Sequence, residues 1–599
     1  SIEPPSWWAR SSIEPLRLLV RGRGLAVARV AGDGGLAFGP PSVNAAGTAL
    51  LVDLSLVRAT PGVHTVRIDA GAAHVSRAWE LAPPLERAGR FAGFSPDDVL
   101  YLLMPDRFAD GDPSNDDPPA SRGLFDRADA RYYHGGDFQG VIDHLPYLAD
   151  LGVTALWMTP IHDNANRLNT HEEHGGRPVT DYHGYGAVDL YGVEEHFGDL
   201  AKLRELVARA HAFGIRVIQD EVANHTGPEH PWAHDPPTAD WLHGTPEHHL
   251  PIELHASSIA DPRADPAVKR RVLDGWFVDL LPDVAQENEE PARYEIQNTL
   301  WWIATAGFDG IRQDTLPYVP RAFWARWMEA IRREFPDVRV VGEMNDPDAR
   351  LVSFFQGGRA RFDGVDSRID TLFDFPLVYP LRRVFAQGAS MKELAVAFET
   401  DSLYVDPSVL VTFAGLHDMK RFMSEPGATT ERFALAQTLL LTARGTPMIY
   451  YGDEIGTRGG DDPDNRRDFP GGFPGDVRNA FTEAGRTAEE QDLFARVRKV
   501  ARARRALAPL RRGRMVMLAA EDRAMAYARV PPDGAGVVVV LHDGAREAVV
   551  TCDVARASLP RDATLVDALG AAPDVHLEGT TLRARMPPRS AAIYTLRAQ

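Results

Sequence analysis

The sequence at residues 215–225 reads IRVIQDEVANH, and this stretch decides the fold. Its first half suits a buried strand, its second half is polar, and an amphipathic helix is predicted before it at 200–213. Further helices are predicted at 293–306, 321–335 and 430–443, between candidate strands at 99–104, 155–158, 215–219, 310–313, 339–342, 364–369, 409–413 and 448–451. Because parallel strands need helical crossovers, this alternation predicts an α/β protein with a (β/α)8 TIM barrel.

The segments outside the barrel pattern predict three additions to it. Residues 224–290 separate the third strand from the fourth, which is too long for one loop, so we expect an inserted subdomain there. Both ends of the chain contain short alternating segments with glycine-rich breaks, which favours antiparallel sandwiches. The expected domains are an N-terminal immunoglobulin-like β-sandwich at 1–90, a catalytic barrel at 91–508 and a C-terminal β-sandwich at 509–599.

The composition is that of a large globular protein, and it excludes several kinds of function. Of the 599 residues, 44% are hydrophobic and 25% are charged. The net charge of −19 argues against binding nucleic acid, which requires a basic surface. No apolar run reaches about 18 residues, so we expect no membrane span. The single cysteine, Cys552, excludes an internal disulfide and a cysteine-only metal cluster.

Residues able to do chemistry follow four of the predicted strands. Active sites of (β/α)8 enzymes lie at the carboxyl ends of the strands, so these residues are expected to share one rim. A single acid at a strand end often only caps the following helix. Capping does not explain a set of four carboxylates, two histidines and an arginine: Asp220, His225, Arg312, Asp314, Glu343, His417 and Asp418.

Paired carboxylates on one rim are typical of glycoside hydrolysis. In the retaining version one carboxylate attacks the anomeric carbon and the other protonates the leaving oxygen, with the two carboxyl groups about 5–5.5 Å apart. Arg312 lies two residues before Asp314, on the same strand face, and its charge favours an ionised Asp314. Glu343 follows three apolar residues at 340–342 and lies near other acids, which raises a carboxyl pKa and suits a general acid.

Four blocks resemble the signature regions of the α-amylase family, glycoside hydrolase family 13: Asp220-x-x-x-Asn224-His225, Gly310-x-Arg312-x-Asp314, Glu343 and His417-Asp418. Residues 3–8, 281–284 and 461–473 are similar to those of its cyclomaltodextrinase and neopullulanase branch. The resemblance implies that Asp314 is the nucleophile, Glu343 the acid/base and Asp418 the third carboxylate of the −1 subsite. It also implies that this subsite is completed by Asp220, His225, Arg312 and His417.

Three more residues resemble sugar-binding positions of the family. Tyr185 resembles its stacking tyrosine, with an ordinary core aromatic as the alternative. Asp462 and Arg466 resemble a pair that binds a more remote glucose, and a solvated charged loop is the alternative reading.

The sequence departs from the family pattern at two places. Gln313 stands where a small or apolar residue usually precedes the nucleophile, and Pro317-Tyr318 replaces a Lys-His pair that often follows it. The second change removes a sugar contact and also a carbonyl ligand of one family calcium site. No calcium is therefore expected at Asn224.

A different segment predicts a structural Ca2+ site. Residues 110–116 read DGDPSND, and GGD follows at 135–137. Calcium takes about six to eight oxygen ligands, and clustered carboxylates repel one another without a cation. The pattern resembles the first calcium site of cyclodextrin glycosyltransferases, while an Asp/Asn-rich turn is the plain alternative. The expected ligands are Asp110, Asp112, Asn115, Asp116, Gly135 and Asp137.

The resemblance implies an oligosaccharide substrate: a cyclodextrin, a short maltooligosaccharide or a related glucan, cleaved at α-1,4 bonds by double displacement. A transglycosylase and a broad α-amylase acting on starch share the same covalent intermediate, so both alternatives stay open. A non-catalytic carbohydrate-binding protein is a third possibility, but it predicts that one of the three carboxylates is missing, and all three are present.

Assembly and location are also implied by the resemblance. In the cyclomaltodextrinase branch the N-terminal domain often covers the partner's active site, so a homodimer through this domain is the implied assembly. Trp7 and Trp8 are either part of that contact or part of the core. The chain begins with Ser1 instead of Met and resembles an exported branch, so we expect a periplasmic or secreted protein, with the cytoplasm as the alternative.

Overall fold

Eight parallel strands form a barrel at the centre of the computed structural model, which describes residues 1–71, 73–557, 559 and 563–596. Their hydrogen-bonded order is β21-β20-β19-β16-β11-β10-β23-β22, and a bridge between Phe373 and Val411 joins the two ends of the series. The predicted (β/α)8 barrel is confirmed. Its strands are β10 (Leu100–Leu103), β11 (Ala155–Met158), β16 (Arg216–Glu221), β19 (Gly310–Gln313), β20 (Arg339–Gly342), β21 (Thr371–Leu372), β22 (Val411–Thr412) and β23 (Thr446–Tyr450).

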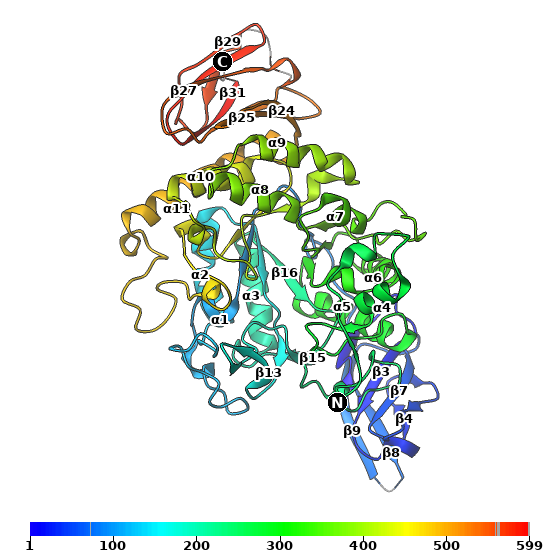
Figure 1. Ribbon diagram of the computed structural model, residues 1–599. Helices are drawn as coiled ribbons and strands as arrows, with labels where there is room; N and C mark the ends of the chain where they lie inside the picture. Colours follow the sequence, from blue (N-terminus) through cyan, green and yellow to red (C-terminus); the bar gives the residue numbers. More distant parts are fainter. Residues whose placement is uncertain (72, 558, 560–562, 597–599) are drawn as a thin grey trace.

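Helices cover the outside of the barrel (Figure 1). Four of them begin at an aspartate whose carboxylate accepts a backbone N–H of the first turn: Asp137, Asp199, Asp265 and Asp348. The amphipathic pattern of the helix that follows β19 buries Trp324 and Trp327. The helices are α1 (Pro105–Phe108), α2 (Phe138–Leu151), α3 (Leu200–Ala212), α4 (Pro266–Leu273), α5 (Glu289–Ala306), α6 (Arg321–Glu334), α7 (Ala349–Phe355), α8 (Phe375–Phe385), α9 (Lys392–Glu399), α10 (Thr430–Thr442), α11 (Ala488–Ala506) and α12 (Ala508–Arg512).

The sixth barrel strand differs from the prediction. It was expected at 364–369, but β21 covers only Thr371–Leu372. Gly364 and Arg368 both have positive φ, 76° and 61°, which no continuous strand can accommodate. Asp366 accepts the N–H groups of Gly358 and Arg368 and stabilises a turn in their place. Turn chemistry therefore determines the structure of residues 364–369, where a strand was predicted.

The long segment after β16 leaves the barrel and returns before α5. It contains β17 (Leu250–Pro251), α4 and β18 (Gly275–Trp276). Two further small sheets lie on the same rim: β12 (His162–Asn164) pairs with β15 (Ala187–Val193), and β13 (Asn169–His174) pairs with β14 (Arg177–Val179). These excursions build walls above the carboxyl ends of the strands.

The N-terminal residues form two antiparallel-rich sheets, and they bury the two tryptophans whose role the sequence left open between a contact and the core. Trp7 and Trp8 are 1% and 2% exposed and stack with their rings 4.2 Å apart, so both are core residues. A 3-10 turn at Leu25–Val27 precedes the strand at Arg29–Gly32. The sheets contain β1 (Ile2–Glu3), β3 (Leu16–Arg21), β5 (Ala37–Phe38), β6 (Ser42–Val43) and β7 (Ala49–Ser55), and β2 (Ser6–Trp8), β4 (Arg29–Gly32), β8 (Gly62–Ala70) and β9 (Ala73–Ala82).

Specific contacts hold these N-terminal sheets against the barrel. Arg17 pairs with Glu290 on α5 at 2.5 Å, and the Tyr294 hydroxyl on the same helix donates to Glu3 at 2.9 Å. Asn44 reaches the excursion and donates to Asp235 at 3.0 Å. The N-terminal sheets therefore brace the wall that the excursion forms.

The C-terminal residues form two sheets at the opposite end of the molecule (Figure 1). Their strands are β24 (Arg514–Ala520), β25 (Ala524–Val530), β26 (Val537–His542), β27 (Ala548–Asp553), β28 (Leu565–Asp567), β29 (Val575–Glu578), β30 (Thr581–Met586) and β31 (Ser590–Leu596).

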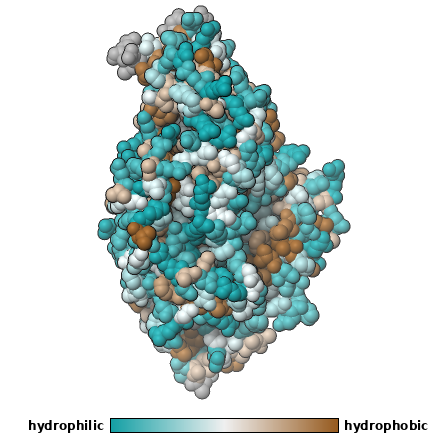
Figure 2. All heavy atoms as spheres, turned by 60° about the vertical axis from the view of Figure 1, so that its left-hand side comes forward, coloured by the Kyte–Doolittle hydropathy of each residue, from teal (hydrophilic) through white to brown (hydrophobic). Residues whose placement is uncertain are grey.

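Hydrophilic side chains dominate the face drawn in Figure 2, with hydrophobic ones gathered in smaller clusters. Among the helices of the described residues, none combines the length and the hydropathy that a bilayer span requires.

Candidate active site

The sequence-predicted residues meet at the carboxyl ends of the barrel strands. Asp220 is the second-last residue of β16, Arg312 belongs to β19, and Asp314 follows β19 directly. Glu343 follows β20, and the His417-Asp418 pair follows β22 after a short loop. In the pairing of β16 with β19, Asp220 stands opposite Arg312, which puts both side chains on the same face of the sheet.

Arg312 lies at the centre of the site, with 1% of its side chain exposed. Nη1 donates to Asp220 Oδ1 at 2.7 Å and to Asp314 Oδ1 at 2.8 Å, while Nη2 donates to Glu343 Oε2 at 2.6 Å. One guanidinium thus connects three carboxylates. Such a cluster needs this cation, because buried carboxylates repel one another strongly.

Asp220 anchors one side of this cluster. Its Oδ2 accepts hydrogen bonds from Trp157 Nε1 at 3.0 Å and from the Tyr185 hydroxyl at 2.8 Å. Burial raises the pKa of Asp220 to about 7, although Arg312 acts to lower it. Asp220 is therefore a buried residue that holds Arg312, Trp157 and Tyr185 in place.

Tyr185 lies in the site and not in an unrelated core. Its ring stacks on His417 with centroids 5.4 Å apart and 5° between the planes, and its hydroxyl lies 2.8 Å from His417 Nε2. Burial lowers the pKa of His417 to about 3, so this imidazole is neutral at pH 7.

Glu343 is placed to carry a proton on one particular oxygen. Oε2 accepts from Arg312 and also from the backbone N–H of Thr315 at 3.3 Å, so the proton belongs on Oε1. Burial raises the pKa of Glu343 to about 8, and the charges of Asp314 and Asp418 add to this effect against the opposing influence of Arg312. A carboxyl group in this environment is protonated at neutral pH.

Asp418 is more exposed than the other carboxylates of the cluster, with 42% of its side chain exposed. It lies 3.2 Å from His417 Nε2 and 3.1 Å from Arg466 Nη2. Burial acts to raise its pKa, but positive charge, from His417 when it is protonated and from Arg466 and Arg312, lowers the pKa of Asp418 below the usual value. Arg466 also pairs with Asp462 at 3.1 Å. The predicted remote pair is thereby linked to the centre of the site and is not a free solvated loop.

His225 forms part of the opposite wall. Its ring stacks on Phe277, with centroids 5.5 Å apart and 9° between the planes, and Tyr318 meets Phe277 edge-on at 5.4 Å. Burial lowers the pKa of His225 to about 4, which makes it a neutral hydrogen-bonding group. The wall is aromatic and suits stacking on the apolar face of a sugar ring.

Sequence reasoning missed several residues of the site. Trp157 belongs to none of the sequence motifs and lies in an apolar strand. Its indole nevertheless donates a hydrogen bond to Asp220, and the guanidinium carbon of Arg312 lies 5.1 Å from the centre of its ring. Phe277 lies in the irregular excursion, far from any strand end. The only sequence signal for Trp157 was a tryptophan in a short strand, which is equally typical of a core residue.

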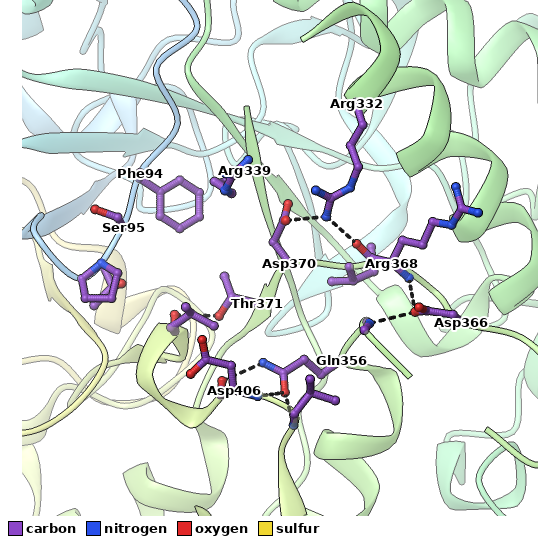
Figure 3. Close-up of a pocket in the computed structure, with 17 residues that line it drawn as sticks. Phe94, Ser95, Arg332, Arg339, Gln356, Asp366, Arg368, Asp370, Thr371 and Asp406 are labelled. Carbon is purple, nitrogen blue, oxygen red and sulfur yellow. Dashed lines mark hydrogen bonds and ion pairs between the residues drawn. The ribbon is translucent and has the colours of Figure 1, made fainter. Parts of the chain in front are cut away.

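A cavity of about 450 Å3 lies at the other end of the barrel and is drawn in Figure 3. It is lined by residues at the starts of strands, such as Arg339 of β20 and Thr371 of β21. Among its charged groups, Arg332 pairs with Asp370 at 2.6 Å. The carboxylate cluster lies at the opposite strand ends, so this cavity is separate from the candidate active site.

The predicted calcium residues also meet in space. Asp110 Oδ1, Asn115 Oδ1 and Asp116 Oδ1 are buried and have no hydrogen-bond partner within the described part of the chain. A Cβ atom on Gly135, which has a φ of 89°, would lie 2.5 Å from Asp116 Oδ1. Burial and neighbouring carboxylates raise the pKa of Asp110 to about 6 and that of Asp116 to about 7. Buried side-chain oxygens without partners, next to the closely packed backbone of Gly135, fit a hard cation such as Ca2+.

Asp137 has a different position in this cluster. Its carboxylate accepts the N–H groups of Gly111, Asp112 and Gly140 at 2.6–3.1 Å. It therefore joins the loop that begins at Asp110 to the start of α2. Asp112 caps its own turn by accepting from Ser114 at 3.2 Å.

Comparisons with known proteins agree with this geometry. The family model of the α-amylase catalytic domain matches residues 102–506. A β/α-amylase of Paenibacillus polymyxa is 34% identical over 384 residues, 62% of this chain and 28% of the relative. Neopullulanase 2 of Thermoactinomyces vulgaris is 32% identical over 448 residues, 72% of this chain and 66% of the relative. The chain thus spans less than two thirds of the length of both.

The solved structures show the same relationship. The crystal structure of an Anoxybacillus α-amylase superimposes with a TM-score of 0.69 at 32% identity, covering 84% of this chain and 98% of that one. Other relatives carry the names cyclomaltodextrinase and cyclomaltodextrin glucanotransferase. The match over the whole barrel, together with the predicted carboxylates at its rim, leads to one conclusion: the chain belongs to the α-amylase family of glycoside hydrolases.

Proposed function

We propose that the protein is a retaining α-glucan hydrolase that cleaves α-1,4-glucosidic bonds of cyclodextrins and short maltooligosaccharides. The observation that carries the proposal is the position of Arg312, whose two terminal nitrogens bind Asp314 and Glu343. One carboxylate is bound by the guanidinium through one oxygen, which leaves its other oxygen for attack, and the second carboxyl group is buried and protonated. This is the division of roles that double displacement requires.

In the first step the nucleophile is Asp314. Its Oδ1 is bound by Arg312, so Oδ2 attacks the anomeric carbon while the bond from that carbon to the departing glycosidic oxygen breaks. The proton on Glu343 Oε1 moves to the departing oxygen. The products are a β-glucosyl ester of Asp314 and a free sugar end.

In the second step the roles of Glu343 reverse. The ionised Glu343 takes a proton from water as that water attacks the anomeric carbon, and the ester bond to Asp314 breaks. The α-anomer is released and Glu343 is again protonated. Asp418, together with the neutral donors His225 and His417, is placed to bind sugar hydroxyls as positive charge develops on the ring.

The choice of substrate rests on two supports. Relatives named neopullulanase and cyclomaltodextrinase align with 72% and 84% of this chain. The aromatic wall of Phe277 and Tyr318 also offers a stacking surface for sugar units beyond the cleaved bond. The test is a substrate panel of β-cyclodextrin, maltotriose, pullulan and starch. A preference for cyclodextrin over starch supports this choice, and a preference for starch would favour a broad α-amylase.

Transglycosylation is the second candidate activity. It is favoured by relatives named cyclomaltodextrin glucanotransferase, and it shares the ester intermediate with hydrolysis. Products of concentrated maltotriose separate the two activities: chains longer than the substrate indicate transfer to sugar, and glucose with maltose alone indicates hydrolysis.

Calcium binding is part of the proposal. The residues that would hold a structural Ca2+ are Asp110, Asn115 and Asp116, supported by Asp112, Asp137 and the backbone at Gly135. The cation would neutralise the carboxylates of the loop and fix it against α2.

We further propose a homodimer through the N-terminal sheets and a periplasmic or secreted location. Because Trp7 and Trp8 are buried, a dimer contact must use other residues of these sheets. A sizing measurement tests the dimer, and fractionation of the source cells tests the location.

A further inference from the structure

Gln313 is the last residue of β19 and stands between Arg312 and Asp314. Because side chains alternate along a strand, its side chain lies on the outer face of the barrel, where it is 0% exposed. From there Nε2 donates to the backbone carbonyl oxygen of Asp314 at 3.2 Å. The side-chain oxygen Oε1 has no hydrogen-bond partner among the described residues. A half-paired buried amide is costly, so packing alone would favour leucine here.

The carbonyl that Gln313 contacts lies where the hydrogen bonding between strands ends. The Asp314 N–H donates to Glu221 O at 2.9 Å, and the Glu343 N–H donates to Gln313 O at 2.9 Å. Strand β16 ends at Glu221, so the next donor of that strand does not reach the Asp314 carbonyl. The amide of Gln313 supplies the donor that the neighbouring strand lacks.

Directly after Asp314 the backbone makes an unusual turn. Thr315 has φ 47° and ψ 36°, a left-handed conformation that is unfavourable for a β-branched residue. In this conformation its N–H donates to Glu343 Oε2 at 3.3 Å, and the Leu316 N–H donates to the Glu343 carbonyl at 3.2 Å. The turn therefore connects the backbone of Asp314 to the side chain of Glu343.

We propose that Gln313 is a positioning residue for Asp314. By donating to the Asp314 carbonyl, its amide holds the last peptide of β19 and the turn at Thr315, which keeps the Asp314 carboxylate aligned beside Arg312. The inference rests on the proposed glycosidase function, because alignment is defined relative to attack by Asp314. Gln313 itself lies on the strand face opposite to that of Arg312 and Asp314.

The test compares Gln313→Leu and Gln313→Glu on maltotriose and on α-maltosyl fluoride. Gln313→Leu is expected to lower kcat by about 10- to 100-fold while KM changes little, since small misplacements of a reacting group have effects of this size. The loss should be equal on both substrates, because fluoride leaves without a proton from Glu343 but still requires attack by Asp314.

Gln313→Glu tests whether Gln313 acts as a hydrogen-bond donor or only packs against its neighbours. A neutral carboxyl group keeps an O–H donor for the Asp314 carbonyl, whereas the ionised form has none. The variant should therefore approach wild-type kcat at low pH and fall toward the leucine variant as pH rises. The leucine variant itself should keep the pH profile of the wild type.

Gln219→Leu is the matched control. Gln219 is buried, precedes Asp220 on the neighbouring strand, and neither of its polar atoms has a partner in the described residues. This variant should resemble Gln313→Leu in thermal midpoint but keep wild-type kcat. Wild-type kcat in Gln313→Leu, or an equal loss in Gln219→Leu, would overturn the inference. A wild-type protein inactive on both substrates would instead contradict the proposed function.

Discussion

Arg312 and Glu343 are joined by a hydrogen bond of 2.6 Å from Nη2 to Oε2. This contact uses the oxygen that Thr315 also binds, and it leaves Oε1 as the site of the transferable proton. The same guanidinium binds Asp314 through Nη1. The arginine thus orients both carboxyl groups, Asp314 through Nη1 and Glu343 through Nη2.

Replacing Asp314 by Asn should remove the nucleophile and keep the shape of the site. The amide can still accept from Arg312 but cannot form the ester, so kcat should fall by at least about 10³-fold. Binding of β-cyclodextrin, measured by calorimetry, should remain within the same range as in the wild type. Turnover near the wild-type rate would show that another group forms the intermediate.

Replacing Glu343 by Gln should produce a loss that depends on the leaving group. Hydrolysis of maltotriose should fall by about 10²- to 10⁴-fold, because the leaving oxygen receives no proton. The first step with α-maltosyl fluoride should be far less affected, as seen in a burst of fluoride release. Equal losses on both substrates would mean that Glu343 is not the acid.

The pH profile should report the raised pKa of Glu343. The acid acts in its protonated form, so kcat/KM should stay high below about 8, the value to which burial raises this pKa, and should fall as pH rises through it. The charge of Asp418 contributes to the increase, so Asp418→Asn should lower the plateau and move the fall to lower pH.

Asp150→Asn serves as the control for that shift. Asp150 is an exposed residue of α2 that pairs with Arg498 at 2.7 Å, far in sequence from the site. The change should leave unaltered the pH at which kcat/KM falls. If kcat/KM of Asp418→Asn falls at the same pH as in the wild type, the charge coupling between Asp418 and Glu343 is contradicted.

Calcium should raise the thermal stability of the protein. Saturating Ca2+ at about 100 times its Kd would add about 2.7 kcal/mol, which is a shift of several degrees. Because the folded pKa values of Asp110 and Asp116 lie above the usual value of 3.8, the cation-free protein loses stability as pH rises toward about 6 and 7. The difference between calcium and chelator should therefore be larger at pH 8 than at pH 5.

Asp116→Asn should abolish the calcium effect and, in chelator at pH 8, be at least as stable as the wild type, since it removes a repelling charge. Asp143→Asn, on the exposed side of α2, should keep the full calcium response. A wild-type midpoint that is the same with calcium and chelator would contradict the proposed site.

The barrel and the centre of the site were predictable because both follow from periodic patterns. The polar residues after apolar strands, such as Asp220 and Asp314, meet because parallel strands end at one rim. The sixth strand was misplaced because Gly364 and Arg368 adopt positive φ, which hydrophobicity does not reveal. Trp157 and Phe277 could not be predicted, since their contacts depend on tertiary packing between segments far apart in the sequence.

Gln313 illustrates the same limit in another way. The sequence identified it as a departure from the family pattern, but only the structure connects its amide to the Asp314 carbonyl. The sequence could not decide whether Trp7 and Trp8 belong to the core or to a dimer contact. Their burial places them in the core.

The central claim is that Asp314 forms a covalent glucosyl ester. It is tested most directly by trapping the intermediate with a slowly reacting fluorinated α-maltosyl fluoride and locating the adduct by mass spectrometry of the peptides. The account predicts one sugar per chain, attached to the carboxylate of Asp314 and absent from Asp314→Asn. An adduct on another carboxylate, such as Asp220 or Asp418, would contradict it.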